Sequence, residues 1–540
     1  MKKYRFPFVF VLLFILTAHS HLEARVRNVI LVIADGLGVQ ELGFAATYAH
    51  HAPKTVVPDR MLALERLLDD GAMALVMTSP HGALVADSAA AGTALACGVP
   101  TVSEALGVDQ RGEPVESILE SAARSGLATG LVTNTKLTHA TPAAFYAHVH
   151  NRYVEWDIAK TLAASGIDVL FGGGLNYLVP RSSLSVPVLS LLGCDPPFPV
   201  RTGRKDGLNL VGEMKRRGYA FACSRESMMA LESSPALGIF AGSHMPCALT
   251  MDAQGDGPSR ATPRLHEMAG KAVELLARKP RGFFLMVEAG QIDFAGHNND
   301  AGSLLHEILD LDRTLAVLLD WMKGRKDTVL ILTADHETGG LAISYTRSDI
   351  PAPSSLPGAV FRDHPFKPGF NYIRPDVLDR IYAQRAPFEA ILNDCDGRDH
   401  ECTPERLVAL FNNAVQFPIT LEEAGQVLAT EPNVYRKDDY HYISDEYFPR
   451  VDDFEAFYVY GDLIRADLLA RIIAAKQGIA WSSGTHSAAP VLMAATGPGS
   501  ALGDVRGLVV QTEVPRMIAR MLGIDEPGGK KAEKPAPALR

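Results

Sequence analysis

The chain has no excess of basic residues. Its 540 residues include 52 Lys and Arg against 62 Asp and Glu, a formal net charge of −10 at pH 7. Binding nucleic acid through its phosphates requires clustered positive charge, so the composition disfavours such a partner. Glycine and proline, 46 and 34 residues, stay well short of a low-complexity composition. With 47% apolar residues, the chain is predicted to fold around a large core rather than remain disordered.

The sequence also has no apolar run at its start long enough to span a bilayer, which takes about 20 residues. The run Phe6–Ala18 has 13 mostly apolar residues, follows Lys2, Lys3 and Arg5, and is followed by small residues. This pattern is typical of an export signal. We predict a cleaved signal peptide at residues 1–24, a periplasmic or secreted location and no stable membrane insertion. An uncleaved membrane anchor is the alternative.

No pair of cysteines has the CxxC spacing, which disfavours a cysteine-based zinc site. Disulfides are permitted in the oxidising compartment that an exported protein enters. Cys395 and Cys402 lie close in sequence and could close a small ring. A second disulfide could join two of three further cysteines, Cys194, Cys223 and Cys247. Cys97 lies in an apolar stretch and is predicted to be a buried free thiol.

Nearly continuous apolar runs predict buried strands, separated by helical patterns. The predicted strands are Asn28–Ala34, Leu127–Thr133, Asp168–Phe171, Gly282–Glu288, Thr328–Thr333 and Pro490–Thr496. Helices are predicted at Pro114–Ser125 and at Ala301–Lys323, where apolar residues recur on one helix face. This alternation indicates an α/β protein, a three-layer α/β/α sandwich with a large, mostly parallel central sheet. Ligands of such sheets bind at the carboxyl ends of the strands.

Carboxylates and histidines follow several of these strands. Asp293 and His297 are four residues apart, so on a helical turn they point the same way and could hold one cation. Asp335 and His336 end a buried strand, where they are costly unless paired or metal-bound. Asp35 alone would indicate a turn. Further candidates are Glu288 and His486. These oxygen and nitrogen donors suit Zn²⁺, and the carboxylates also suit Mg²⁺, so together they predict a multi-metal centre.

Ser88 is the candidate nucleophile. It follows Asp87 and precedes a run of small, helix-forming residues, which places it at the start of a helix. Backbone N–H groups and the helix dipole favour an anion there. A simple N-cap serine is the alternative interpretation. Metal coordination would lower the pKa of the hydroxyl and make it a nucleophile.

Seven short motifs, in this order, resemble the signature set of the alkaline phosphatase family. They are Asp35-Gly-Leu-Gly, Asp87-Ser88-Ala, Thr138-His139-Ala-Thr141-Pro, Asn151-Arg152, Val287-Glu288 to His297, Thr333-Ala-Asp335-His336 and Gly484-Thr-His486. The resemblance covers about residues 25–345 and 480–525. It implies a metal-dependent hydrolase of phosphate monoesters and, from the habit of the family, a homodimer.

The resemblance also implies a role for each residue. Ser88 would form a phosphoserine intermediate, and Arg152, oriented by Asp87, would clamp two phosphate oxygens. Three residues, Asp293, His297 and His486, would hold a first zinc ion. A second zinc ion would be held by Asp35, Asp335 and His336. A magnesium ion would be held by Asp35, Thr141 and Glu288. His139 would lie near the magnesium. Phe294 occupies a position that is Lys, His or Trp elsewhere in the family; an aromatic residue there is similar to some cold-active bacterial members, and Phe offers phosphate neither charge nor a hydrogen bond.

Length alone predicts three or four domains. The proposed metal ligands, however, run from Asp35 to His486, so one active site needs almost the whole chain. We therefore predict a single catalytic domain over residues 25–525, with insertions at about 180–265 and 343–480 and a disordered tail at 526–540. The alternatives are a phosphodiesterase or sulfatase-type hydrolase on the same scaffold, or a non-catalytic secreted protein that binds metal or phosphate.

Overall fold

The middle of the sheet forms around a strand with no polar side chain after its first residue. The computed structural model describes residues 25–69, 71–181, 195–255, 257, 260–397, 401–440 and 442–528. In it β1 (Asn28–Ile33) is buried along its whole length and pairs in parallel with β7 (Phe283–Glu288) and β8 (Thr328–Thr333). Strands buried on both faces need such continuous apolar sequences. The predicted signal peptide and most of the predicted tail lie outside the described residues.

Within the described residues the main sheet has ten strands, and all pairings except those of β15 are parallel. In spatial order they are β16 (Gly507–Val510), β2 (Ala72–Met77), β15 (Val491–Thr496), β8, β1, β7, β3 (Ala128–Lys136), β4 (Val169–Gly173), β6 (Ala236–Ile239) and β5 (Ala220–Ala222). The six predicted strands are confirmed. β5 and β6 come from the stretch 180–265, so part of that stretch extends the sheet rather than standing apart from it.

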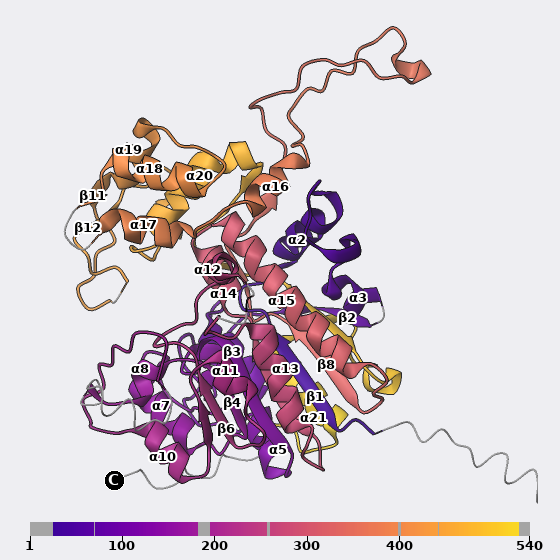
Figure 1. Cartoon of the computed structure of the whole chain (residues 1–540), viewed down its shortest axis with the longest axis vertical. Coiled ribbons are helices and arrows are strands. Elements are labelled where there is room, and N and C mark those ends of the chain that lie inside the picture. Colours follow the sequence, from indigo (N-terminus) through magenta and orange to yellow (C-terminus); the bar gives the residue numbers. More distant parts are fainter. Residues whose placement is uncertain are drawn as a thin grey trace, which may run out of the picture.

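Helices cover both faces of the sheet (Figure 1). One layer contains α13 (Leu265–Leu276) and α15 (Ala301–Met322), which pack against each other. The other contains α4 (Ser88–Cys97), α5 (Ile118–Arg124) and α21 (Val514–Leu522). The predicted α/β/α layering is confirmed. The other described helices of this part of the chain are α2 (Val39–His51), α3 (Ala63–Asp69), α6 (Ala140–Ala143), α7 (Glu155–Ala164), α8 (Leu175–Leu178), α10 (Leu210–Arg216), α11 (Arg225–Met229), α12 (Ala248–Gln254) and α14 (Gln291–His297).

Capping residues set the helix ends. The helix expected from Pro114 begins at Ile118, because Ser117 accepts a hydrogen bond from the backbone N–H of Glu120 in a capping box. Its neighbour α4 begins after Asp87, whose carboxylate accepts from the N–H groups of Ala89 and Ala90. The long helix α15 ends one residue short of the predicted end.

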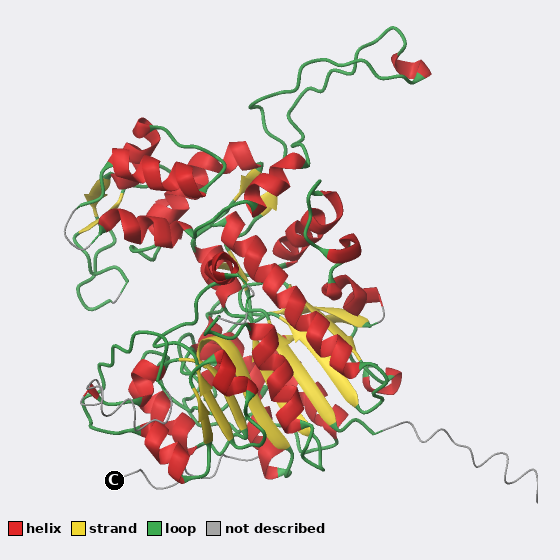
Figure 2. Ribbon diagram, viewed as in Figure 1, coloured by secondary structure: helices red, strands yellow, loops and turns green. Residues whose placement is uncertain are grey.

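A second, mostly helical lobe lies above the carboxyl edge of the sheet (Figure 2). It comes from the predicted insertion and consists of α16 (Asp376–Tyr382), α17 (Phe388–Asp396), α18 (Pro404–Ala414), α19 (Leu421–Leu428), α20 (Ile464–Gln477) and the short pairs β11 (Thr430–Pro432) with β12 (Tyr447–Pro449) and β10 (Ala342–Ile343) with β13 (Ile479–Ala480). A disulfide joins Cys395 to Cys402, a pairing that their short spacing in the sequence had left open. Cys223 is also disulfide-bonded, whereas Cys97 is a buried free thiol and Cys247 a free thiol.

An arm formed by residues 345–374 projects away from the rest of the molecule (Figure 1). Its two sides meet at the bridges between Thr346 and Asn371 and between Ser354 and Phe366. No described helix of the chain is both long and apolar enough to cross a membrane.

Asp300 fastens the helical lobe to the sheet domain. It caps α15 by accepting from the backbone N–H of Ser303, and it also accepts from the side chain of Gln384 at 2.7 Å and from the N–H of Phe388 at 2.9 Å. The Asp300 side chain is buried, so without it no water molecule would take its place as the acceptor for these donors.

We therefore expect Asp300→Ala to lower the free energy of unfolding by about 2–4 kcal/mol, because one substitution removes a cap and strands two buried donors. Chemical denaturation measures this. Asp320→Ala, an exposed site on the same helix, is the matched control and should cost under about 0.5 kcal/mol. Equal effects of the two substitutions would contradict this role.

Candidate active site

The register of the parallel strands gathers the predicted site residues at one edge of the sheet. Ile33 at the end of β1 lies between Glu288 of β7 and Thr333 of β8. Asp35 lies two residues after Ile33, and Asp335 lies two residues after Thr333, so both residues follow their strands at the edge where Glu288 ends β7. Parallel strands place their carboxyl ends together, which is why residues about 300 positions apart become neighbours.

The turn after β1 must be glycine for the metal donors to approach. Gly36 has φ +80°, and a Cβ atom on it would lie 2.6 Å from Asp293 Cα and 2.9 Å from the Thr338 hydroxyl. Its N–H donates to Asp335 at 3.2 Å. Thr338 belongs to the short β9 (Glu337–Thr338), which pairs with β14 (His486–Ser487) and so carries His486 to the same edge.

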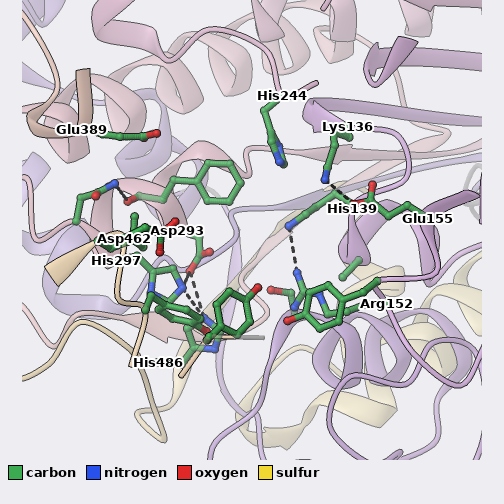
Figure 3. A pocket seen from close by; sticks show the side chains of 18 of the residues that line it. Lys136, His139, Arg152, Glu155, His244, Asp293, His297, Glu389, Asp462 and His486 are labelled. Atoms are coloured by element: carbon green, nitrogen blue, oxygen red, sulfur yellow. Dashed lines mark hydrogen bonds and ion pairs between the residues drawn. The ribbon is translucent and has the colours of Figure 1, made fainter. Parts of the chain in front are cut away.

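Ser88 is the first residue of α4, and its hydroxyl is not used to cap the helix. Asp87 is the N-cap, so the N-cap alternative for Ser88 is wrong. The Ser88 Oγ lies 3.2 Å from His336 Nε2, and the residue is 1% exposed. It borders a cavity of about 370 Å³ (Figure 3). Asp87 accepts from the N–H groups of Ala89 and Ala90, so these two donors of the first turn are already used within the helix.

Arg152 is one of two basic residues that line this cavity. Its Nη1 donates to Asp87 Oδ2 at 3.2 Å, and its Nη2 lies 3.2 Å from His139 Nε2. Burial alone would lower the pKa of Arg152, but the Asp87 carboxylate keeps it above its usual value. The planar guanidinium is therefore charged and held on both sides, an arrangement suited to binding two oxygens of one anion.

The first group of metal donors is Asp293, His297 and His486. Both histidine Nδ1 atoms lie 2.8 Å from backbone carbonyls, of Gly484 and Ala86, so each Nδ1 carries the proton. Each Nε2 then presents a lone pair, and the two Nε2 atoms are 3.0 Å apart. They lie 3.4 and 3.5 Å from Asp293 Oδ1. Two nitrogen lone pairs that face each other beside the Asp293 carboxylate repel one another. This arrangement is stable only when a proton or a metal ion lies between them.

Two further groups share Asp35. One joins it to Asp293 and His336, and the Asp335 Oδ2 atom lies 3.2 Å from His336 Nε2. The other joins it to His139 and Glu288, with the Thr141 hydroxyl donating to Asp35 at 3.2 Å. Glu288 also accepts from Thr133 and Thr135. All the predicted ligands, Asp35, His139, Thr141, Glu288, Asp293, His297, Asp335, His336 and His486, therefore lie in one continuous cluster.

The charges of this cluster fit metal ions. One oxygen each of Asp35, Glu288 and Asp335 is buried and finds no hydrogen-bond partner among the residues that the structure describes. Burial, and then the neighbouring carboxylates Asp335, Asp293 and Glu288, raise the pKa of Asp35 well above its usual value. Burial followed by Asp293 raises the pKa of Asp335 to about 7. Buried carboxylate oxygens that lie close together without hydrogen-bond donors are stabilised by cations.

The cavity also contains residues that the sequence interpretation missed. Lys136, the last residue of β3, pairs with Glu155 at 2.8 Å, and Thr138 donates to the same carboxylate at 2.7 Å. His244, interpreted as structural, lines the cavity with its ring edge-on to Phe294 at 4.8 Å. Lys136 ends a strand at the carboxyl edge of the sheet. The expectation that site residues lie at the carboxyl ends of the strands, which located Glu288, could therefore have located Lys136 as well. The helical lobe adds Glu389, Tyr442, Tyr460, Asp462 and Leu463.

Comparison with known proteins gives one consistent result. The sequence model of the family described as alkaline phosphatase matches residues 26–365. Alkaline phosphatase 4 of Bacillus subtilis is 35% identical over 329 residues, which cover 59% of this chain and 63% of that protein. The match thus spans under two thirds of that relative.

Solved structures extend the likeness over almost the whole chain. Thermus thermophilus alkaline phosphatase is 29% identical with a TM-score of 0.74, covering 93% of this chain and 92% of that one. A cold-active alkaline phosphatase from Shewanella sp. shares the fold at 22% identity, with a TM-score of 0.64 over 92% of this chain and 99% of that one. Because the family model covers more than half of the sequence, the chain belongs to the alkaline phosphatase family.

Proposed function

We propose that the protein hydrolyses phosphate monoesters to an alcohol and inorganic phosphate through a phosphoserine on Ser88. One observation carries the proposal: a buried serine hydroxyl, an arginine hydrogen-bonded to Asp87 and three adjoining groups of candidate metal donors lie around one cavity. Phosphoryl transfer needs little covalent chemistry from the protein beyond positioning and charge stabilisation, and this site is arranged for both.

In the first step the Ser88 oxygen attacks phosphorus and the ester oxygen leaves with the alcohol; in the second, water attacks and the Ser88–phosphate bond breaks. Arg152 binds two non-bridging oxygens and keeps the phosphorus in line with Ser88 Oγ. Asp87 fixes both partners, because it caps the helix that carries Ser88 and accepts from Arg152. Phe294 adds no hydrogen bond to phosphate; its ring packs against His139 and His244.

We assign two zinc ions and one magnesium ion to the donors. Asp293, His297 and His486 would hold one zinc. The second zinc would be held by Asp35, Asp335 and His336, and magnesium by Asp35, Thr141 and Glu288 with His139 nearby. When bound, these ions neutralise the carboxylates, stabilise the charge of the transferring phosphoryl group and lower the pKa of hydroxyl groups beside them.

Two further proposals concern the setting of the enzyme. Export is supported by disulfide-bonded cysteines, since disulfides persist in oxidising compartments.

A homodimer is supported by the arm at 345–374, which exposes seven large apolar residues: Tyr345, Ile350, Leu356, Val360, Phe366, Phe370 and Tyr372. The arm has four basic and two acidic residues, whereas the whole chain has a net charge of −10, so the arm is opposite in sign to the net charge of a second copy.

Substitution of the nucleophile tests the mechanism. Ser88→Ala should lower kcat for p-nitrophenyl phosphate by at least about 10³-fold, because the phosphoserine can no longer form. Unfolding measurements check that the variant is intact. The wild-type enzyme should prefer this monoester over bis-p-nitrophenyl phosphate and p-nitrophenyl sulfate. A diester or sulfate preference would favour the alternatives, and unchanged hydrolysis by Ser88→Ala would refute the phosphoserine.

Metal removal tests the donor assignment. Chelation should abolish activity and lower Tm, because unscreened carboxylates then repel one another in the core. Zn²⁺ and Mg²⁺ together should restore both, with elemental analysis giving two zinc and one magnesium per chain. Full activity in protein free of both metals would contradict the assignment.

The arm provides a test of the dimer. Light scattering after size-exclusion chromatography should find a dimer for the wild type. The triple variant Val360→Ser, Phe366→Ser, Tyr372→Ser should weaken the dimer, because the arm then buries less apolar surface. Val434→Ser, an exposed apolar site in the helical lobe, is the control and should leave the mass unchanged. A monomeric wild type at micromolar concentration would refute the proposal.

A further inference from the structure

The outer wall of the cavity is a continuous row of aromatic rings. The ring of His297 meets Tyr460 edge-to-face at 4.9 Å, Tyr460 meets Tyr442 at 4.8 Å, and Tyr442 meets Tyr153 at 6.1 Å. Tyr153 in turn lies 5.9 Å below the guanidinium of Arg152. The row therefore runs from a metal donor to the phosphate clamp, beside the position where the alcohol part of a substrate must lie.

Two carboxylates complete this wall, Glu389 and Asp462. Figure 3 places both on the side of His297, across the cavity from Lys136 and His244. Burial raises the pKa of Glu389, and the charge of Asp462 raises it further, so the two carboxylates act on each other. Among the described residues no ion pair is found for either of them.

The basic groups of the cavity do not offset these charges. Lys136 is paired with Glu155, and Arg152 is paired with Asp87 and faces the phosphate site. On the same helical lobe Arg465 pairs with Asp396 rather than with Asp462. The part of the cavity beyond the phosphate site is thus negative and aromatic.

Aromatic faces together with carboxylates form an environment that favours an organic cation. The negative face of a tyrosine ring attracts an ammonium group, and a quaternary ammonium has no N–H donors and relies on such faces and on net charge. The same wall repels anionic groups.

We propose that this wall selects phosphate monoesters whose alcohol part carries a positive charge, namely amino-alcohol phosphates with a quaternary or primary ammonium group. The phosphate lies at Ser88 and Arg152, and the ammonium group lies against Tyr442 and Tyr460 beside Asp462 and Glu389. This selectivity rests on the phosphatase activity proposed above. Monoesters with an anionic alcohol part, such as phosphorylated hydroxy acids, are disfavoured for the same reason.

A pair of isosteric substrates isolates the charge. Phosphocholine and 3,3-dimethylbutyl phosphate differ only in a positively charged nitrogen in place of a carbon. The holoenzyme should show a kcat/KM ratio of about tenfold in favour of phosphocholine at low salt, the scale of one cation–π contact with screened carboxylates. In Glu389→Gln, Asp462→Asn the ratio should fall towards one. Tyr442→Leu should lower it as well, whereas Tyr442→Phe, which keeps the ring, should retain most of it.

A matched control removes the same charge elsewhere. The double variant Asp445→Asn, Glu446→Gln neutralises two exposed carboxylates that are close in sequence to Tyr442 but do not line the cavity. The kcat/KM ratio of the two esters should stay at the wild-type value in this variant. A wild-type ratio near one, or a ratio that Glu389→Gln, Asp462→Asn leaves intact, overturns the selectivity. Failure to hydrolyse either ester overturns instead the phosphatase activity on which it rests.

Discussion

The dominant physical constraint on this structure is the repulsion between buried carboxylates at the carboxyl edge of its sheet, which must be offset. Asp35, Glu288, Asp293 and Asp335 are each at most 3% exposed, and three of them leave an oxygen without a hydrogen bond. Burying a single unpaired carboxylate is costly, and placing four together multiplies the cost. A fold that holds these carboxylates together needs cations to offset their charge. The raised pKa values of Asp35 and Asp335 reflect the cost of ionising both groups in this buried cluster.

The rest of the molecule holds this cluster rigid. The register of β1, β7 and β8 fixes three carboxylates to the most deeply buried strands. The short pairing of β9 with β14 brings His486 across from a distant part of the chain. Asp87 links the helix that carries Ser88 to Arg152, so the proposed nucleophile and the proposed phosphate-binding arginine are both held by this one carboxylate. The helical lobe, fastened at Asp300, then closes the cavity with tyrosines and acids of its own.

Much of this could be predicted from the sequence. Continuous apolar runs revealed six of the strands, because a strand buried on both faces leaves a strong local pattern. The other four sheet strands were missed for physical reasons. β2 alternates between buried and exposed residues, β5 and β6 are only three and four residues long, and β16 has four residues of which three are exposed. The donors were found because they follow strands or match family motifs. Tyr442, Tyr460 and Asp462 were not, because only the packing of the helical lobe over the sheet edge makes them part of the site.

The central claim is that the carboxylate cluster is a metal centre, and anomalous diffraction at the zinc absorption edge tests it most directly. On crystals of the holoenzyme we expect two strong anomalous peaks, one among Asp293, His297 and His486 and one among Asp35, Asp335 and His336. Density beside Asp35, Thr141 and Glu288 should show no zinc signal, as magnesium requires. The absence of anomalous peaks from both places in zinc-loaded, active crystals would contradict the account.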